Sequence, residues 1–350
     1  MNDAERCWEI LPKVSRSFAL CIKILPKPLN GQMMVSYLIY RILDTIEDSD
    51  APLDEKGALF EEFLGLLKGR KLSEAAAGRC ASRMLSALNY TYEKELLEST
   101  LPVLRLYFSQ PAGVRRYIFK RGKSMARGMY EFQKRGIVTF ADQNRYSHYV
   151  AGVIGYLFND LLFFNGIITG SLKRKLRRYA KHFGLALQKV NILRDIAADI
   201  RENRHYWPSA VMHKYGLTYE NLCLKEKREA AMKVLSEQIR NAREYLVSAM
   251  KYVTMLPEKA VRVRMFCLIP LFMAIESYVK CAGNAEVFEN GKVVKISREQ
   301  VYGIVAKSRV WGSSNERLVK WFLSAMGGVS PELQKDYAQI FAAAPAARNQ

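Results

Sequence analysis

The sequence lacks the residue patterns that mark several common kinds of site. Its six cysteines include no Cys-x-x-Cys pair, and its four histidines form no cluster with them. No Gly-x-Gly-x-x-Gly motif follows a predicted strand. These absences argue against a zinc centre, a disulfide framework and a Rossmann-type nucleotide site. We therefore expect reduced thiols and a cytoplasmic location.

Long apolar runs are also missing. The longest uncharged runs, 146–159 and 161–172, are separated by Asp160, and each is shorter than the roughly 18 residues of a membrane span. The first residues, Met1 to Glu5, carry acidic side chains and no long apolar region, so no signal peptide is expected. The sequence predicts no transmembrane helix. The glycines and polar residues of the two runs favour buried helices that line a cavity.

Negative charge is in short supply. The chain has 54 lysines and arginines against 34 aspartates and glutamates, a formal net charge of +20 at pH 7. Such an excess fits an anionic partner such as a diphosphate substrate, a nucleic acid or the anionic face of a membrane. Part of it lies in clusters, including Arg115-Arg116, Lys120-Arg121 and the run 173–178. A run of the last kind is ordinarily a solvated helix face.

Strand signals are scarce, whereas apolar residues recur at intervals of three and four almost throughout, which predicts an all-α fold. The clearest helical ranges are 54–67, 81–97, 225–250 and 257–279, and helix-start signals stand at Ser297 and Ser330. The exception is the segment 287–296, where Asn290-Gly291 between apolar runs predicts a short β-hairpin. Because no repeat, linker or break in composition is found, residues 1–350 are predicted to form one large helical domain.

Two acidic clusters at helical spacing lie far apart in the chain, each in a mainly apolar stretch. Asp44, Glu47 and Asp48 share one helix face, and Asp195 and Asp199 share another, since residues three and four apart project together. A buried carboxylate without compensation is too costly to keep, so each cluster needs cations. All-oxygen ligand sets suit Mg²⁺, which usually keeps several waters and is completed by substrate phosphates. The two clusters together predict a diphosphate held by several metal ions.

A polar line continues from each cluster along its helix. Tyr37 and Arg41 precede the first cluster on its face, whereas Gln188 and Asn191 precede the second, with Arg194 beside it. The alternative interpretation is that each motif is an ordinary solvated helix face. An arginine on or beside both acidic lines, in stretches whose other residues are largely apolar, favours a functional site.

Several motifs resemble, in their order and spacing, those of the squalene and phytoene synthases. They are Ser15-Arg16-Ser17-Phe18, Arg41 with the cluster 44–48, the block 146–152 and the stretch 188–199. The resemblance covers roughly residues 10 to 325. Three further segments are similar to the squalene-forming members of that family in particular, namely Tyr206-Trp207-Pro208, 266–270 and 287–300.

This resemblance implies an all-α fold of the isoprenoid synthase type with a central cavity. It also implies that Mg²⁺ ions bridging prenyl diphosphates are held by the five carboxylates Asp44, Glu47, Asp48, Asp195 and Asp199. Diphosphate oxygens or the phosphates of NADPH would be bound by Arg16, Arg41 and Arg194, to which the planar, permanently charged guanidinium is suited.

The resemblance implies roles for further side chains near the reacting carbons. Tyr149 would be the aromatic hydroxyl beside them, with Tyr37 and Gln188 close by. Asn191 would contact the substrate, and Phe266 would line the region of a second, reductive half-reaction.

Lys295 would contact NADPH. The chain departs from the family pattern nearby, because Ser297 stands where a basic residue is expected and Leu271 where animal and fungal enzymes commonly carry glutamine. Arg298, next to Ser297, would compensate.

The implied reaction joins two farnesyl diphosphates head to head into presqualene diphosphate and then reduces it with NADPH to squalene. Sister enzymes that make phytoene, dehydrosqualene or presqualene diphosphate keep both acidic motifs and are the enzyme alternatives. An alternative of another class is a basic helical nucleic-acid-binding protein. It explains the charge of +20 but not two inward acidic clusters, which repel phosphate without metal, so no nucleic-acid partner is expected.

The basic surface and the oily product together predict a cytoplasmic protein that associates peripherally with the cytoplasmic face of an anionic membrane. The substrate's chain length, the residue that accepts the proton and the oligomeric state stay open.

Overall fold

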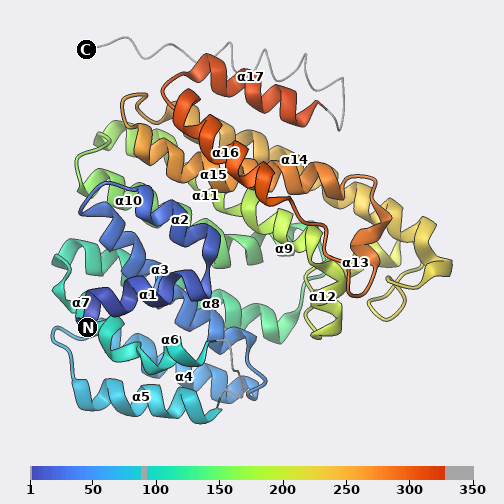
Figure 1. The fold of residues 1–350 in the computed structure, drawn as a ribbon. Coiled ribbons are helices and arrows are strands. Elements are labelled where there is room, and N and C mark those ends of the chain that lie inside the picture. The colour runs from blue at the N-terminus through green and yellow to red at the C-terminus, as the bar shows by residue number, and fades with distance from the viewer. Residues whose placement is uncertain (1, 88–92, 328–350) are drawn as a thin grey trace. The chain divides into compact units, whose positions relative to one another are not determined.

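Every regular element in the described part of this computed structural model, residues 2–87 and 93–327, is a helix (Figure 1). The predicted all-α fold is therefore confirmed. The chain divides into two compact units, one formed by residues 1–135 and 153–175 and the other by 136–152 and the chain from Leu176 onward. The expectation of one domain over 1–350 stays a prediction, as does the central cavity.

The first unit is built from helices that each bury one side. Their bounds are α1 Asp3–Val14, α2 Arg16–Ile24, α3 Leu29–Asp48, α4 Leu53–Lys68, α5 Glu74–Ala87, α6 Lys94–Glu98, α7 Thr100–Ser109, α8 Ala112–Arg135, α10 Val153–Phe164 and the start of α11 Gly170–Arg194. Leu38 and Ile42 of α3 and Val114 and Ile118 of α8 are fully buried, each pair at the four-residue spacing of a helix that packs on one face. α3 contacts α1, α2, α4, α7, α8 and α10, so it is the central helix of this unit, and α8 packs against α3, α4 and α10.

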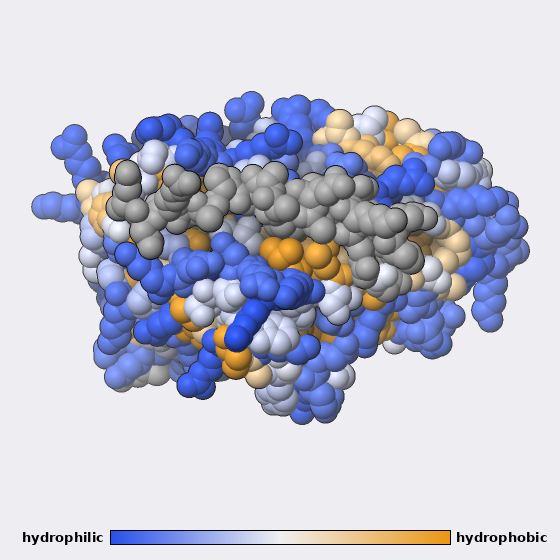
Figure 2. Space-filling model, turned by 90° about the horizontal axis from the view of Figure 1, so that it is seen from above, coloured by the Kyte–Doolittle hydropathy of each residue, from blue (hydrophilic) through white to orange (hydrophobic). Residues whose placement is uncertain are grey.

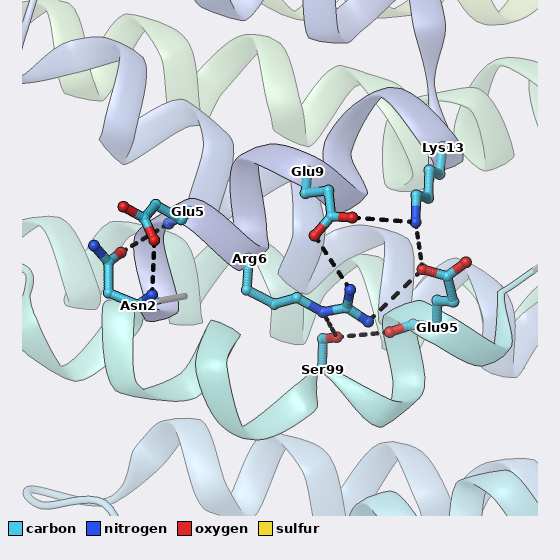
Figure 3. Close-up of polar contacts among 7 residues, drawn as sticks. All are labelled: Asn2, Glu5, Arg6, Glu9, Lys13, Glu95 and Ser99. Atoms are coloured by element: carbon cyan, nitrogen blue, oxygen red, sulfur yellow. Dashed lines mark hydrogen bonds and ion pairs between the residues drawn. The ribbon is translucent and has the colours of Figure 1, made fainter.

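Polar contacts tie α1 to the start of α7 and to α6 (Figure 3). Arg6 Nε donates to Ser99 Oγ at 3.1 Å, and Lys13 Nζ lies 2.6 Å from Glu95 Oε2. Lys13 and Glu95 are exposed, so their ion pair contributes little to stability, whereas Ser99 is buried. The two contacts link α1 to α6 and to Ser99, where α6 ends and α7 begins.

The second unit contains the rest of α11 and the helices that follow it. Its elements are α9 Phe140–Ser147, the π-helix η1 His148–Gly152, α12 Ile196–Arg201, α13 Ser209–His213, the 3₁₀-helix η2 Lys225–Lys227, α14 Arg228–Met255, α15 Val261–Cys281, the 3₁₀-helix η3 Ala285–Phe288, α16 Arg298–Trp311 and α17 Asn315–Met326. Its core includes large side chains with almost no exposure, among them Trp207, Tyr252 and Tyr278.

The π-helix packs against α11 almost backbone to backbone. A Cβ added to Gly184 of α11 would lie 2.2 Å from the carbonyl oxygen of Ala151, and one added to Gly152 would lie 2.8 Å from Leu185 Cδ1. Only glycine permits such an approach at Gly184, since the atom it would meet belongs to the backbone. The contact fixes η1, which carries Tyr149, on the helix that carries Gln188.

The predicted β-hairpin over 287–296 is wrong. A turn does form at Asn290-Gly291, where Gly291 has φ +80°, but no strand flanks it. Val287 and Phe288 instead lie in the 3₁₀-helix η3, and the ring of Phe288 meets that of the buried Trp207 edge-on at 5.8 Å. Packing against the helices thus outweighs the strand propensity of this segment.

The predicted helices agree with the structure in most places. The range 54–67 lies within α4, 225–250 within η2 and α14, and 257–279 largely within α15. The range 81–97 covers the end of α5, residues outside the described part and α6. Ser297 begins α16 through a capping box with Gln300. The helix expected from Ser330 lies outside the described residues.

The surface is mainly hydrophilic on the face drawn in Figure 2, and its apolar side chains lie in separate patches. Among the described residues, no helix is both long enough and apolar enough to cross a bilayer.

We predict that Gly184→Ala lowers the free energy of unfolding by several kcal/mol, because its Cβ forces α11 away from the π-helix. Gly303→Ala is the matched control, since Gly303 also lies in a helix of this unit and a Cβ there meets nothing within 4 Å. The control should gain up to about 1 kcal/mol. Urea denaturation measures both variants, and equal stabilities would contradict the close packing.

Candidate functional site

The first acidic cluster occupies the last turns of α3. Asp44 and Asp48 are partly exposed, whereas Glu47 is 4% exposed. Lys56 Nζ donates to the backbone oxygen of Glu47 at 2.7 Å, and Gln133 Nε2 donates to the same oxygen at 2.6 Å. Because the last carbonyls of a helix lack partners within it, these two bonds fix the end of α3 and with it the position of the carboxylates.

Arg41 is paired with two carboxylates. Its guanidinium donates to Asp44 one turn further along α3 and to Glu93 at the start of α6. Burial disfavours the charged form, but Asp44, Tyr37 and Glu93 outweigh it and raise the pKa of Arg41 above its usual range. Arg41 is therefore a fixed positive charge beside the acidic cluster. Glu93 was not predicted, since only the fold brings it to Arg41.

The motif at residues 15–18 contacts the polar line of α3. The Ser15 side chain caps α2 by accepting from the backbone N–H of Phe18, and the Phe18 ring lies 5.6 Å from that of Tyr37. Burial raises the pKa of Tyr37, although its hydrogen bond with Ser15 opposes the shift. The first unit thus brings this motif together with Tyr37 and Arg41. Arg16, the first residue of α2, is exposed.

The second acidic cluster lies at a helix break. α11 ends at Arg194, and Asp195 is the N-cap of α12. The break is small, because the N–H of Asp195 still donates to Asn191 O at 2.9 Å and that of Asp199 to Asp195 O at 2.8 Å. Asp195 and Asp199 therefore remain one turn apart, as their spacing predicts.

Each aspartate of this cluster has an arginine partner. Arg194 donates to both carboxylate oxygens of Asp195, with Nε at 2.8 Å and Nη2 at 2.6 Å. Burial opposes the charge of Arg194, but the contact with Asp195 raises its pKa. Asp199, 7% exposed, has Arg204 Nε at 3.5 Å from Oδ1.

The contact of Arg204 with Asp199 was not predicted, although Asn203, the residue before Arg204, is a sequence signal for it. Asn203 has φ +55°, and after it the N–H of Arg204 donates to Asp199 O at 2.7 Å. A left-handed asparagine after the last turn is a common helix ending that returns the next residue toward that turn.

Tyr149 lies in the π-helix, which the sequence did not predict. It is partly exposed, with the His148 ring at 5.4 Å and the Arg145 guanidinium at 5.9 Å from its own ring. Single π-turns inside helices are frequent at functional sites. On α11, Gln188 is partly exposed and Asn191 exposed.

The residues implied for the reductive step differ in their surroundings. Phe266 lies in α15 and is 6% exposed, with Leu271 fully buried in the same helix. Lys295 and Arg298 are exposed, and the backbone oxygen of Lys295 accepts from Lys280 Nζ at 3.0 Å. Ser297 serves as the N-cap of α16, which explains a hydroxyl there in structural terms.

A buried lysine that the sequence analysis did not select joins three segments of the second unit. Lys189 Nζ donates to Gln143 Oε1 of α9 at 2.9 Å and to Asn241 Oδ1 of α14. Gln143 Nε2 in turn donates to the backbone oxygen of Tyr206 at 2.9 Å. The signal was present, because Lys189 falls among the apolar residues of α11 at helical spacing from Leu185 and Ala186.

The donor chemistry of both clusters fits Mg²⁺, since all ligands are carboxylate oxygens. Among residues 2–87 and 93–327, no three His, Cys, Asp or Glu side chains are grouped closely enough to form a ready metal cage. Protein-bound Mg²⁺ commonly takes only one or two carboxylates, together with several waters and substrate phosphates.

The model of the squalene/phytoene synthase family matches residues 11–300. The chain belongs to the squalene/phytoene synthase family.

Known proteins of similar sequence carry the name squalene synthase. That of Schizosaccharomyces pombe is 31% identical over 317 residues, which cover 88% of this chain and 65% of the relative. Squalene synthase LSS of Botryococcus braunii is 32% identical over 296 residues, 83% of this chain and 60% of the relative. The chain thus spans less than two thirds of the length of these two relatives.

Solved structures agree with the family assignment. A complex of TcSQS with a ligand has a TM-score of 0.82 at 26% identity, covering 97% of this chain and 96% of that one. A dehydrosqualene synthase complex has a TM-score of 0.58 at 19% identity, covering 88% and 96%, and shows a shared fold alone. The all-α isoprenoid synthase fold expected for this family member is therefore confirmed.

We predict that Lys189 makes stability depend on pH. Burial lowers its pKa from 10.5 to about 7 in the folded protein. Between these values the unfolded state binds the extra proton, so the free energy of unfolding rises with pH, by up to about 1.4 kcal/mol per pH unit. Urea denaturation between pH 7 and about pH 9.5 should show a shallower rise in Lys189→Met than in the wild type.

Lys175→Met, which removes an exposed lysine, is the control and should keep the wild-type slope. Equal slopes in Lys189→Met and the wild type would show that Lys189 is protonated in the folded protein.

Proposed function

We propose that this family member is a squalene synthase. It condenses two farnesyl diphosphates head to head into presqualene diphosphate and then reduces this intermediate with NADPH to squalene. The main support for the proposal is that a chain of this family carries two acidic motifs, each with an arginine paired to one of its carboxylates. Relatives named squalene synthase, 30–32% identical to it, support the choice of product.

The carboxylates Asp44, Glu47, Asp48, Asp195 and Asp199 would hold the Mg²⁺ ions. When bound, these ions neutralise the charge of the departing diphosphate. Arg41 and Arg194 would bind diphosphate oxygens, because each carries a fixed positive charge at its acidic cluster. Asn191, exposed on α11, would contact the substrate beside them.

Loss of diphosphate leaves an allylic cation, which needs a dry pocket and electron-rich surfaces. Tyr37 and Tyr149 would offer aromatic faces to that cation, with Gln188 near them. The raised pKa of Tyr37 keeps its hydroxyl protonated at neutral pH. Bond formation between the two farnesyl chains releases one proton, which passes to Tyr149 or to the departing diphosphate.

The second half-reaction would expel the remaining diphosphate, and bound NADPH would supply a hydride for the reduction. Phe266 would shape the apolar wall at this step. Arg16, Lys295 and Arg298 are exposed cations suited to NADPH phosphates, with Arg41 and Arg194 as further candidates. We also propose a cytoplasmic location with peripheral attachment to the anionic face of a membrane.

The second candidate is a sister activity that forms phytoene, dehydrosqualene or presqualene diphosphate. It is favoured by Ser297, which caps α16 at the position where the family pattern has a basic residue. Product analysis after incubation with farnesyl diphosphate and Mg²⁺ separates the two candidates. Squalene should form with NADPH, and presqualene diphosphate should accumulate without it. Presqualene diphosphate alone, or a dehydrogenated thirty-carbon product, at saturating NADPH would assign the chain to the sister group.

We predict that Asp48→Asn and Asp199→Asn each slow the first condensation by two orders of magnitude or more, because loss of a metal ligand costs several kcal/mol of leaving-group stabilisation. Diphosphate release measures the rate, and circular dichroism checks the fold. Asp50→Asn, two residues beyond the cluster and exposed, is the control and should react normally. Near-normal release in either test variant would remove that residue from the metal site.

We predict that Lys295→Ala weakens NADPH binding and leaves the first half-reaction intact, since both acidic clusters are unchanged. At limiting NADPH this variant should accumulate presqualene diphosphate, measured against squalene by chromatography. Lys292→Ala is the matched control, because Lys292 is exposed in the same segment but pairs with Glu286 and Glu289. A product ratio in Lys295→Ala equal to that of the control would exclude Lys295 from the NADPH site.

A further inference from the structure

One side of α8 carries a line of positive charge that the proposed reaction does not use. Arg116, Lys120, Lys123 and Arg127 follow one another at spacings of four, three and four residues, and all four are exposed. Residues at this spacing share one helix face. At 1.5 Å per residue the line extends over about 16 Å. We call these four residues the α8 basic stripe.

Within the described part of the chain, no ion pair joins the α8 basic stripe to a carboxylate. The one acidic residue of α8, Glu131, lies 3.5 Å from Arg135. The neighbouring Asp160 of α10 is buried and contacts Arg121 at 2.6 Å and Lys173 at 2.8 Å. The stripe therefore keeps its charge for an external anion.

Two exposed aromatic rings lie beside the first turn of this stripe. Phe163 and Phe164, at the end of α10, are each 41% exposed. Phe164 covers Gly113, where an added Cβ would lie 2.8 Å from its ring, and Gly113 is one turn before Arg116. The ring of Phe163 lies 4.7 Å from Lys173 Nζ. Lys173 Nζ also lies 5.1 Å from the ring of Tyr117, the residue next to Arg116, so both phenylalanine rings lie near the first turn of the stripe.

We propose that the α8 basic stripe, with Phe163 and Phe164, docks this protein on an anionic lipid bilayer. The cations would meet headgroup phosphates, and the two rings would enter the interface between headgroups and acyl chains. Surfaces that combine a basic line with exposed apolar rings bind anionic membranes by both attractions. This inference rests on the proposed function and identifies the surface by which the protein would attach to the membrane. Squalene, the proposed product, is apolar and would enter the bilayer.

The test is co-sedimentation of the full chain with vesicles of phosphatidylglycerol and phosphatidylcholine in equal parts, and with phosphatidylcholine alone. The wild type should bind the anionic vesicles and be released by salt, because surface charge attraction is screened. Lys120→Glu/Lys123→Glu should bind at least about tenfold more weakly. Phe163→Ser/Phe164→Ser should also bind more weakly, but its residual binding should stay salt-sensitive.

Lys23→Glu/Arg79→Glu is the matched control, since it makes the same change of net charge at exposed residues of α2 and α5, whereas α8 packs against α3, α4 and α10. It should bind nearly as the wild type does. Equal losses in the control and the stripe variant would reduce the effect to net charge and overturn the proposal. Duplex DNA bound as tightly as the anionic vesicles, and lost with the stripe, would assign the surface to nucleic acid instead.

Diphosphate release from farnesyl diphosphate without vesicles separates this inference from the proposed function. The stripe variant should retain that activity, and its loss would place the stripe in the catalytic machinery and overturn docking. If the wild type makes no squalene but the vesicle results hold, the docking surface stands and the proposed product fails.

Discussion

The pairing of arginine with carboxylate on the helix surfaces is the interaction on which the site depends. On α3 and at the start of α12, acidic side chains gather within one turn on helices that are otherwise largely buried. Like charges at this spacing destabilise a helix, and partial burial adds to the cost. Arg41 and Arg194 each compensate one carboxylate of their own cluster, Asp44 and Asp195 respectively, and so reduce that cost.

This arrangement also explains why the cation paired with each acidic cluster, Arg41 or Arg194, is an arginine rather than a lysine. Both guanidinium groups are partly buried, and a lysine in such a place loses its proton more readily. In the proposed reaction the same arginines bind the diphosphate, so their partners change from carboxylate to phosphate while their charge stays fixed. The helix ends support this exchange: Lys56 and Gln133 hold the last turn of α3, and Arg204 holds the last turn of α12.

The sequence predicted the acidic clusters and their helices because spacing along one helix determines which side chains share a face. It did not predict Glu93 beside Arg41, since that contact depends on how α6 is held in the fold. The π-helix at Tyr149 was also missed, because one extra residue in a helical turn leaves no mark in a pattern of three and four. Gly184 was the one sequence signal for the π-helix, because a glycine inside a helix and away from any turn indicates a close approach of another backbone.

The predicted hairpin failed for a related reason. Asn290-Gly291 does turn the chain, so the local signal was sound, but a strand also needs a partner edge and this unit offers helices. Val287 and Phe288 therefore pack as a 3₁₀ turn against Trp207. The turn at Asn290-Gly291 was therefore predicted correctly, whereas the conformation of the residues on either side of it depends on tertiary packing.

The α8 basic stripe does not lie on the side of α8 that packs against α3, the helix of the first acidic cluster. α8 turns Gly122 toward Tyr40 of α3, where a Cβ would lie 3.4 Å from the ring, and the Tyr40 hydroxyl donates to Ile118 O. Helical geometry then sends the residues of the α8 basic stripe away from α3. Their position outside the packed face is the one that the proposed docking on an anionic bilayer requires.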